Sequence, residues 1–185
     1  MNIATYFRFL VYLAALSGLT ACSLSNTHIK NGQISGLQPI MQAYQKTVRQ
    51  AHADDQYQWN NGRLGNILVN LDADSHRGLC FHWQKMVYIG IQAALVKSGW
   101  KATGIAINEG SFFEHHAVLV YDPAKTRLNN ILVNSNKSNS YVLDPWSSGE
   151  ARVYSLDNWL QLPLTIMAPA RLTAINTRPV YPPSL

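Results

Sequence analysis

The chain has 185 residues and a formal net charge of +5, from 15 Lys and Arg against 10 Asp and Glu. Its cations form no clustered run, and a nucleic-acid partner would need a basic stripe, so the composition argues against nucleic-acid binding. The mild positive charge still favours attraction to an acidic wall polymer or to lipid head groups.

The first 22 residues have the organisation of a secretory signal. Arg8 is their only charged side chain, an apolar run covers residues 9–16, and small residues follow. That run falls short of the ~20 residues needed to cross a bilayer, so it predicts a cleaved signal peptide rather than a membrane span. Residues 19–22, LTAC, resemble the lipobox of bacterial lipoproteins, which implies cleavage before Cys22 and acylation of that cysteine.

Acylation at Cys22 by several chains such as palmitate would anchor the protein stably in a membrane. Ser23 stands where an aspartate tends to retain bacterial lipoproteins at the inner membrane, so the resemblance implies an outer-membrane anchor that faces the periplasm. The alternative is an ordinary signal peptide that leaves Cys22 as a free thiol. The predicted organisation is a signal peptide over 1–21, a polar lipidated tether over 22–36 and one domain over 37–185.

Two helices are predicted in the first half of this domain. Pro39 suits the first turn of a helix that continues to about residue 53. A second helix is predicted over about 79–98, because apolar residues recur there at 3- and 4-residue steps and Gly99 supplies the stop. Between the helices, the run 66–71 is compatible with a short strand or a helical turn.

The hydrophobic period changes after residue 100. Short apolar runs there are separated by turns rich in Asn, Gly, Pro and Ser. They predict strands at 101–107, 116–121, 130–134, 141–143 and 151–156, and a short helical turn at 157–162. Helices followed by a run of strands predict an α+β fold in which an antiparallel sheet packs on the central helix.

Cys80 is the only cysteine beyond residue 22, and it falls in the first turn of the second predicted helix. A lone thiol in an oxidising compartment is either buried and inert or retained for chemistry. A helix start stabilises a thiolate through its unpaired N–H groups and its dipole. A histidine on a strand could take the thiol proton, a carboxylate could orient the imidazole, and N–H groups around Cys80 could bind an oxyanion.

Three motifs occur in the order that such chemistry requires: RGLC before the helix, HAVLVY on a strand, and VLDPW at the end of a later strand. Together they resemble the transglutaminase-like core of the papain-like clan over about residues 76–146. By residue match the resemblance implies Cys80 as the nucleophile, His116 as the base because it precedes Ala117, and Asp144 as the acid that orients the base. It also implies a papain-like sheet packed on the helix that carries the cysteine.

Other interpretations of the same residues remain open. His115 and His116 open a strand, so their side chains point to opposite faces and only one of them can face the thiol; we expect His115 at the rim. A zinc site formed by Cys80, His76 and His82 is an alternative, although no CxxC or HExxH spacing supports it. An oxyanion-binding side chain is expected, if anywhere, in the loop 56–61.

The sequence therefore predicts a periplasmic lipoprotein with a catalytic thiol. It would be a cysteine peptidase or amidase, or a transglutaminase-like acyltransferase, that cleaves or transfers an amide bond in a protein or a cell-wall peptide without a cofactor. The alternative is a catalytically inactive lipoprotein that keeps the same fold as a binding or scaffolding module.

Overall fold

A computed structural model describes residues 34, 36–54, 79–111, 113–133, 139–162 and 166–175. The elements within these residues are α2 (Gln38–His52), α4 (Cys80–Ser98), β1 (Lys101–Ile107), β2 (His115–Tyr121), the 3-10 helix η1 (Leu128–Asn130), β3 (Ser140–Leu143), β4 (Val153–Ser155), α5 (Leu156–Leu160) and β5 (Arg171–Thr173).

Several predictions concern residues outside the described ranges and stay predictions. These are the signal peptide over 1–21, the lipidated Cys22, the loop 56–61 and the run 66–71. Within the described residues, no helix combines the length and the apolar character needed to cross a membrane. Ile34, near the end of the predicted tether, already packs on the core.

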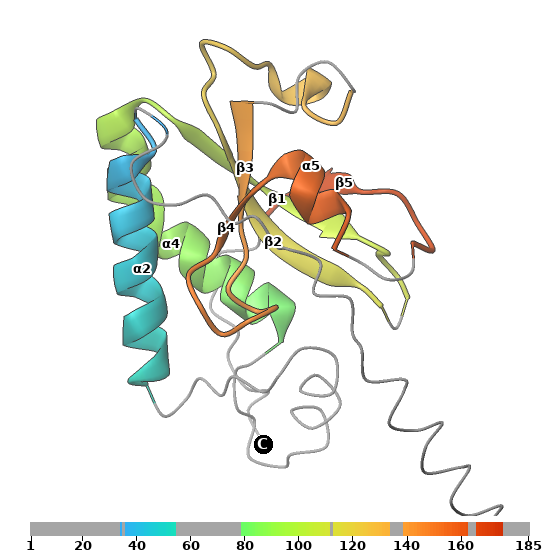
Figure 1. Cartoon of the computed structure of the whole chain (residues 1–185), viewed down its shortest axis with the longest axis horizontal. Coiled ribbons are helices and arrows are strands. Elements are labelled where there is room, and N and C mark those ends of the chain that lie inside the picture. The colour runs from blue at the N-terminus through green and yellow to red at the C-terminus, as the bar shows by residue number, and fades with distance from the viewer. Residues whose placement is uncertain are drawn as a thin grey trace, which may run out of the picture.

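The five strands form one sheet in the order β4-β3-β2-β1-β5, and each neighbouring pair is antiparallel. Figure 1 shows α2 and α4 side by side along one side of the sheet, while α5 lies over the other side. This arrangement confirms the predicted α+β class, with an antiparallel sheet that packs on a central helix.

The central strand β2 is buried on both faces. Val118 and Val120 belong to the core cluster that includes the apolar sides of α2 and α4. Leu119 and Tyr121 belong to a second cluster, which includes Trp159 of α5. Because both faces are covered, the strand is apolar at successive positions and its sequence carries no inside–outside alternation.

Helix α4 begins at Cys80 although no Ser, Thr, Asp or Asn precedes it. The Nδ1 atom of His82 accepts a hydrogen bond from the backbone N–H of Leu79 at 3.4 Å, which satisfies one of the donors at the helix start. The helix ends at Gly99, whose φ of 72° is the left-handed conformation common at helix C-termini. The predicted helix over 79–98 is thereby confirmed to within one residue.

One predicted strand is absent from the described residues, and one observed strand was not predicted. The predicted strand at 130–134 is wrong, because residues 128–130 form η1 and 131–133 form a turn, with residue 134 outside the described part. In that turn only Ile131 is fully buried. The apolar run therefore contributes one side chain to the core and does not pair as a strand. Strand β5 was not predicted; Asn108 holds the segment before it by accepting hydrogen bonds from Met167 and Ala168 N–H.

Helices α2 and α4 approach closely where Gly90 faces Thr47. A Cβ atom at Gly90 would lie 2.6 Å from the Thr47 methyl carbon. We expect Gly90→Ala to lower the free energy of unfolding by up to about 2 kcal/mol, since overpacking costs about 1–3 kcal/mol and alanine gains roughly 1 kcal/mol over glycine in a helix. Urea unfolding of Gly90→Ala, Thr47→Ala and the double variant measures this. The double variant should recover most of the loss, and a Gly90→Ala protein more stable than wild type would contradict the close approach.

Candidate active site

Asp144 follows β3 directly, and its side chain is fully buried. Its Oδ2 atom accepts hydrogen bonds from His115 Nε2 at 2.7 Å, Ser147 Oγ at 2.7 Å and Trp159 Nε1 at 2.9 Å. Burial acts to raise the pKa of this carboxyl, but the charge and hydrogen bond of His115, with the bonds from Ser147 and Trp159, lower it below its ordinary value. Asp144 is therefore an anion in the core that accepts from three side-chain donors at Oδ2 and from Ser147 N–H at Oδ1.

His115 opens β2 and presents its two ring nitrogens to different partners. Nε2 donates to Asp144, because a carboxylate oxygen only accepts. Burial acts to lower the pKa of His115, but the charge and hydrogen bond of Asp144, followed by the hydrogen bond and charge of Cys80, raise it to about 10. The imidazole is thus electrostatically coupled to a carboxylate on one side and to a thiol on the other.

Cys80 is a free, buried thiol at the first position of α4. With Nε2 of His115 bonded to Asp144, Nδ1 is the nitrogen left for the thiol. Nδ1 is buried and makes no hydrogen bond of standard geometry to any group in the described part of the chain. Since Cys80 nevertheless raises the pKa of His115, the thiol lies close to this ring. The order of groups is thiol, imidazole, carboxylate.

Two tryptophans enclose the imidazole. The ring of Trp146 lies 4.5 Å from that of His115 and the ring of Trp159 lies 5.6 Å from it, both tilted by about 30°. Trp159 also donates to Asp144, so one side chain both packs on the imidazole and stabilises its carboxylate partner. These contacts limit water around the imidazole–carboxylate pair, where a low dielectric strengthens the interaction.

The prediction that His116 is the histidine at the site is wrong in its geometry. The antiparallel register of β2 and β3, continued by one residue, sets Asp144 opposite Ala117. Side chains alternate along a strand, so His115 shares the face of Asp144 and His116 points to the other face. The register agrees with the argument that the two rings point to opposite faces, and it places His115 on the face of Asp144 instead of the residue chosen by motif match.

His116 has a partner of its own in the turn between β1 and β2. Its Nε2 atom donates to Glu114 at 2.5 Å, and the second oxygen of that carboxylate accepts from Gly110 N–H at 2.6 Å. The bonds from His116 and from Gly110 lower the pKa of Glu114 below its ordinary value. His116 therefore stabilises this turn, and His115 is the histidine that contacts Asp144.

The sequence did not point to Ser147 or Trp159 as parts of the site. Ser147 and Trp146 follow Asp144 within three residues, so the stretch DPWS carried a usable signal for an Asp-centred turn. Trp159 lies 15 residues beyond Asp144, and no local pattern connects the two. Its place depends on how α5 folds back over the sheet.

Metal binding has no support in the described part of the chain, where no group of three or more His, Cys, Asp or Glu could hold an ion. His82, one of the proposed zinc ligands, accepts from the backbone at the start of α4 instead. His76 lies outside the described residues. Gln84, another polar residue of α4, is buried and donates to Ala117 O at 2.7 Å, so its role there is structural.

No family model, no curated protein and no solved structure matches the chain. What carries a functional proposal is the geometry itself: a buried thiol, a largely buried imidazole and a buried carboxylate that come from α4, β2 and the end of β3.

The His115–Asp144 pair should make the free energy of unfolding fall as the pH becomes alkaline. The pKa of His115 is about 10 in the folded protein and 6.5 is its ordinary value. Because the folded value is the higher one, the protonated ring contributes stability that is fully present below about pH 6.5 and is lost as the pH rises toward about 10. In urea unfolding across this range, the advantage of wild type over His115→Gln should shrink. His116→Gln should keep the wild-type trend, and an advantage that does not change with pH would contradict the pair.

The indole N–H of Trp159 should stabilise the fold through Asp144. Trp159→Phe keeps an aromatic ring and removes only this donor, leaving a buried charge with one bond fewer. We expect the free energy of unfolding to fall by about 1–3 kcal/mol. Trp100→Phe is the matched control, because Trp100 is also buried but packs on Tyr141. Equal losses in the two variants would assign the effect to packing alone.

Proposed function

We propose that the protein is a thiol enzyme that cleaves or transfers an amide bond through Cys80, His115 and Asp144. The observation that carries the proposal is the coupling of a largely buried imidazole to a carboxylate, at 2.7 Å from Nε2, and to a thiol at a helix start. A purely structural ion pair would need neither a thiol beside it nor a helix start under that thiol.

The residues would divide the chemistry as follows. Cys80 Sγ attacks the substrate carbonyl while Nδ1 of His115 takes or already holds the thiol proton, and the same nitrogen later gives that proton to the leaving amine. The C–N bond breaks and a thioester on Cys80 remains. Water then hydrolyses the thioester to an acid, or a second amine takes the acyl group, and the thiol is regenerated.

Asp144 would act through the imidazole rather than on the substrate. Its bond to Nε2 keeps that proton in place and directs Nδ1 toward Cys80 throughout the cycle. The donors Ser147 and Trp159 hold the carboxylate in turn. At the start of α4, backbone N–H groups without an intrahelical acceptor would receive the oxyanion of the tetrahedral intermediate.

We further infer that the chain is a transglutaminase-like member of the papain-like clan. In support, a cysteine at a helix start, a histidine on β2 and an aspartate after β3 come together around an antiparallel sheet. The histidine stands one residue before the position that the family motif indicates. Acylation at Cys22 would hold this enzyme at the outer membrane, facing the periplasm, where proteins and cell-wall peptides would be its substrates.

The enzyme proposal is tested by acylation of Cys80 with p-nitrophenyl acetate, followed by release of nitrophenol and by the intact mass of the protein. We expect a single acetyl adduct in wild type and none in Cys80→Ala. His115→Ala should slow acylation by about 10²–10⁴-fold, the usual contribution of a general base. His116→Ala, the adjacent control, should change the rate by less than about tenfold, since its partner is Glu114.

The same experiment distinguishes an enzyme from a non-catalytic binding module. A wild-type protein that forms no adduct would favour the non-catalytic binding module, and a rate that depends on His116 but not on His115 would contradict the site described above. Where acylation behaves as expected, wild type and Cys80→Ala incubated with cell-wall fragments and with periplasmic proteins distinguish the two substrate classes by mass spectrometry of the products.

A further inference from the structure

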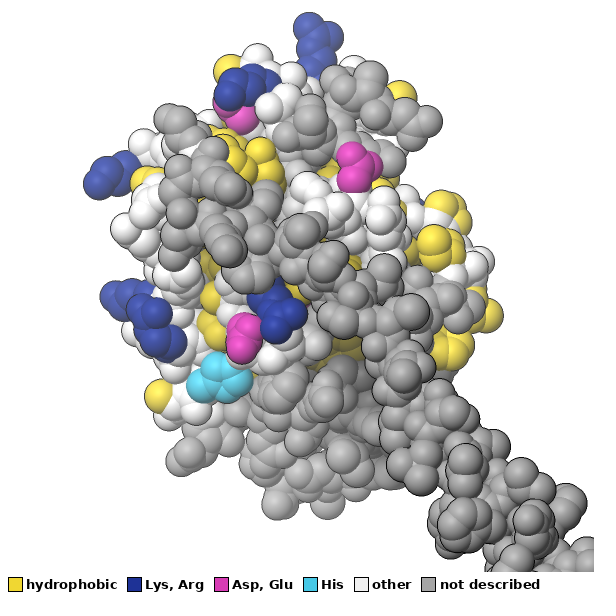
Figure 2. All heavy atoms as spheres, in the orientation of Figure 1, with side chains coloured by type: hydrophobic (Ala, Val, Ile, Leu, Met, Phe, Trp, Pro, Cys, Tyr) yellow, Lys and Arg dark blue, Asp and Glu magenta, His cyan; other side chains and the backbone are white. Residues whose placement is uncertain are grey.

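The two long helices on one side of the sheet carry positive charge only. Helices α2 and α4 contain no Asp or Glu, while Lys46, Arg49, Lys85 and Lys97 lie on them. Figure 2 shows Lys and Arg side chains that project from the side of the molecule on which α2 lies. The outer side of this helical layer is therefore complementary to an anionic partner.

The same side exposes apolar side chains on α4. Ile89 is 52% exposed and Val96 is 83% exposed, and Ala93 between them is also exposed. These residues recur at 4- and 3-residue steps, so they form one stripe along the helix, opposite the buried Val87 and Ile91. An apolar stripe within an acid-free layer is unusual for a face that contacts only water.

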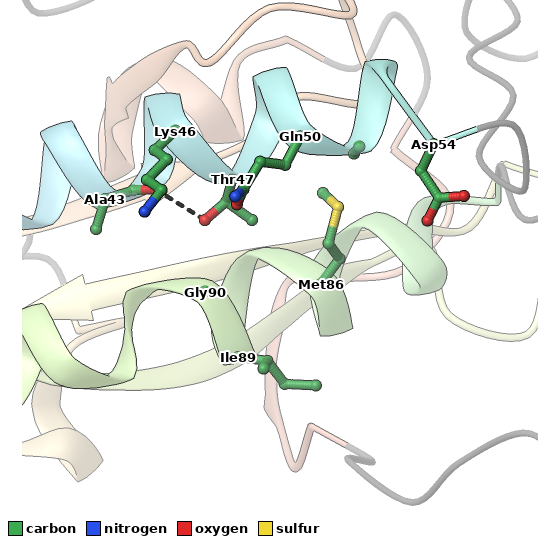
Figure 3. Close-up of a pocket in the computed structure, with 9 residues that line it drawn as sticks. Ala43, Lys46, Thr47, Gln50, Asp54, Met86, Ile89 and Gly90 are labelled. Carbon is green, nitrogen blue, oxygen red and sulfur yellow. Dashed lines mark hydrogen bonds between the residues drawn. The ribbon is translucent and has the colours of Figure 1, made fainter.

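The outer sides of the two helices form one continuous surface. Lys46 and Gln50 of α2 line a groove of about 490 Å³ together with Met86 and Ile89 of α4 and with Asp54, which follows α2, as Figure 3 shows. Gly90, where the two helices approach closely, also lines the groove. We call the surface formed by Lys46, Arg49, Ile89, Ala93, Val96 and Lys97 the helix-layer face.

We propose that the helix-layer face docks on an anionic phospholipid bilayer. Lys and Arg side chains near an anionic surface each favour binding, and exposed aliphatic side chains between them enter the boundary between head groups and acyl chains. Single Lys or Arg contacts of this kind are weak, so the docked state depends on several of them acting together.

The position of the chain before α2 supports this partner. Cys22, the predicted acylation site, is separated from Ile34 by 11 residues, a stretch that spans at most ~40 Å when extended. Figure 1 shows that the start of α2 lies beside the end of α4, so the tether joins the domain at the end of the layer that carries Val96 and Lys97. An anchored domain would thus meet the bilayer at high local concentration.

Docking through this face would leave the proposed active site open. Cys80 is at the opposite end of α4 from Lys97, and a rise of 1.5 Å per residue places their backbones ~26 Å apart. His115 and Asp144 lie with Cys80, at that same end of α4. The inference does not depend on catalysis, because the face shares no residue with the site.

The test is sedimentation of the mature chain, residues 22–185 with Cys22→Ser, with unilamellar vesicles, so that no acyl anchor contributes. Vesicles of phosphatidylglycerol and phosphatidylethanolamine are compared with vesicles of phosphatidylcholine at about 0.02 M salt, where charge is weakly screened. We expect binding to the anionic vesicles only. Lys46→Gln, Arg49→Gln and Lys97→Gln combined should weaken it roughly a hundredfold, at about fivefold per cation.

Two further variants decide between the face and general charge. Ile89→Asp with Val96→Asp should abolish vesicle binding, while Lys125→Gln with Arg127→Gln, exposed cations in the segment after β2, should leave it nearly unchanged. Binding that the face variants leave intact, or equal binding to both kinds of vesicle, would overturn the proposal. A change in the sedimenting mass of Ile89→Asp with Val96→Asp in the absence of vesicles would also overturn it, by making the face a contact between copies of the chain.

Discussion

The buried carboxylate of Asp144 is the constraint on which the other features of the site depend. An unpaired charge in the core is very costly, so this anion persists only where donors surround it. Its donors come from three separate parts of the chain: His115 at the start of β2, Ser147 after β3, and Trp159 on α5. Each segment must take its native position before the charge is met. The interaction therefore links the sheet to α5. Folding itself thereby orients the imidazole of His115.

The register between β2 and β3 determines which histidine meets Asp144. Adjacent histidines on one strand present their rings to opposite faces, and a shift of one residue in the pairing would exchange them. In the observed register His115 meets Asp144 and Cys80, while His116 bonds to Glu114 in the β1–β2 turn. Both faces of β2 are packed, which fixes the register firmly. Thus the choice between two chemically identical neighbours is made by the packing of Val118, Leu119 and Val120 further along the strand.

Much of this architecture follows from the sequence, and the exceptions share one cause. The helix that begins at Cys80 and the strand that precedes Asp144 were predictable, because periodicity, glycine stops and turn residues are local signals. The choice of His115 was not, since it depends on a register between strands separated by 18 residues, Asp122 to Asn139. β5 is a three-residue strand, and the segment before it is held by Asn108, which lies 59 residues before Met167. Trp159 reaches Asp144 only through the same kind of long-range contact.

Helix α4 joins the proposed chemistry to the proposed membrane contact. Its first residue is the thiol, its buried side packs on β2 and β1, and its outer side carries Ile89 and Val96. A helix of 19 residues is a rigid element. A domain that lies on a bilayer through the outer side of α4 would therefore hold its thiol at a set orientation to that surface. Tethering alone would not do this, because a polar linker leaves the orientation free. Since acylation of Cys80 and binding to anionic vesicles involve different residues, each proposal can fail while the other stands.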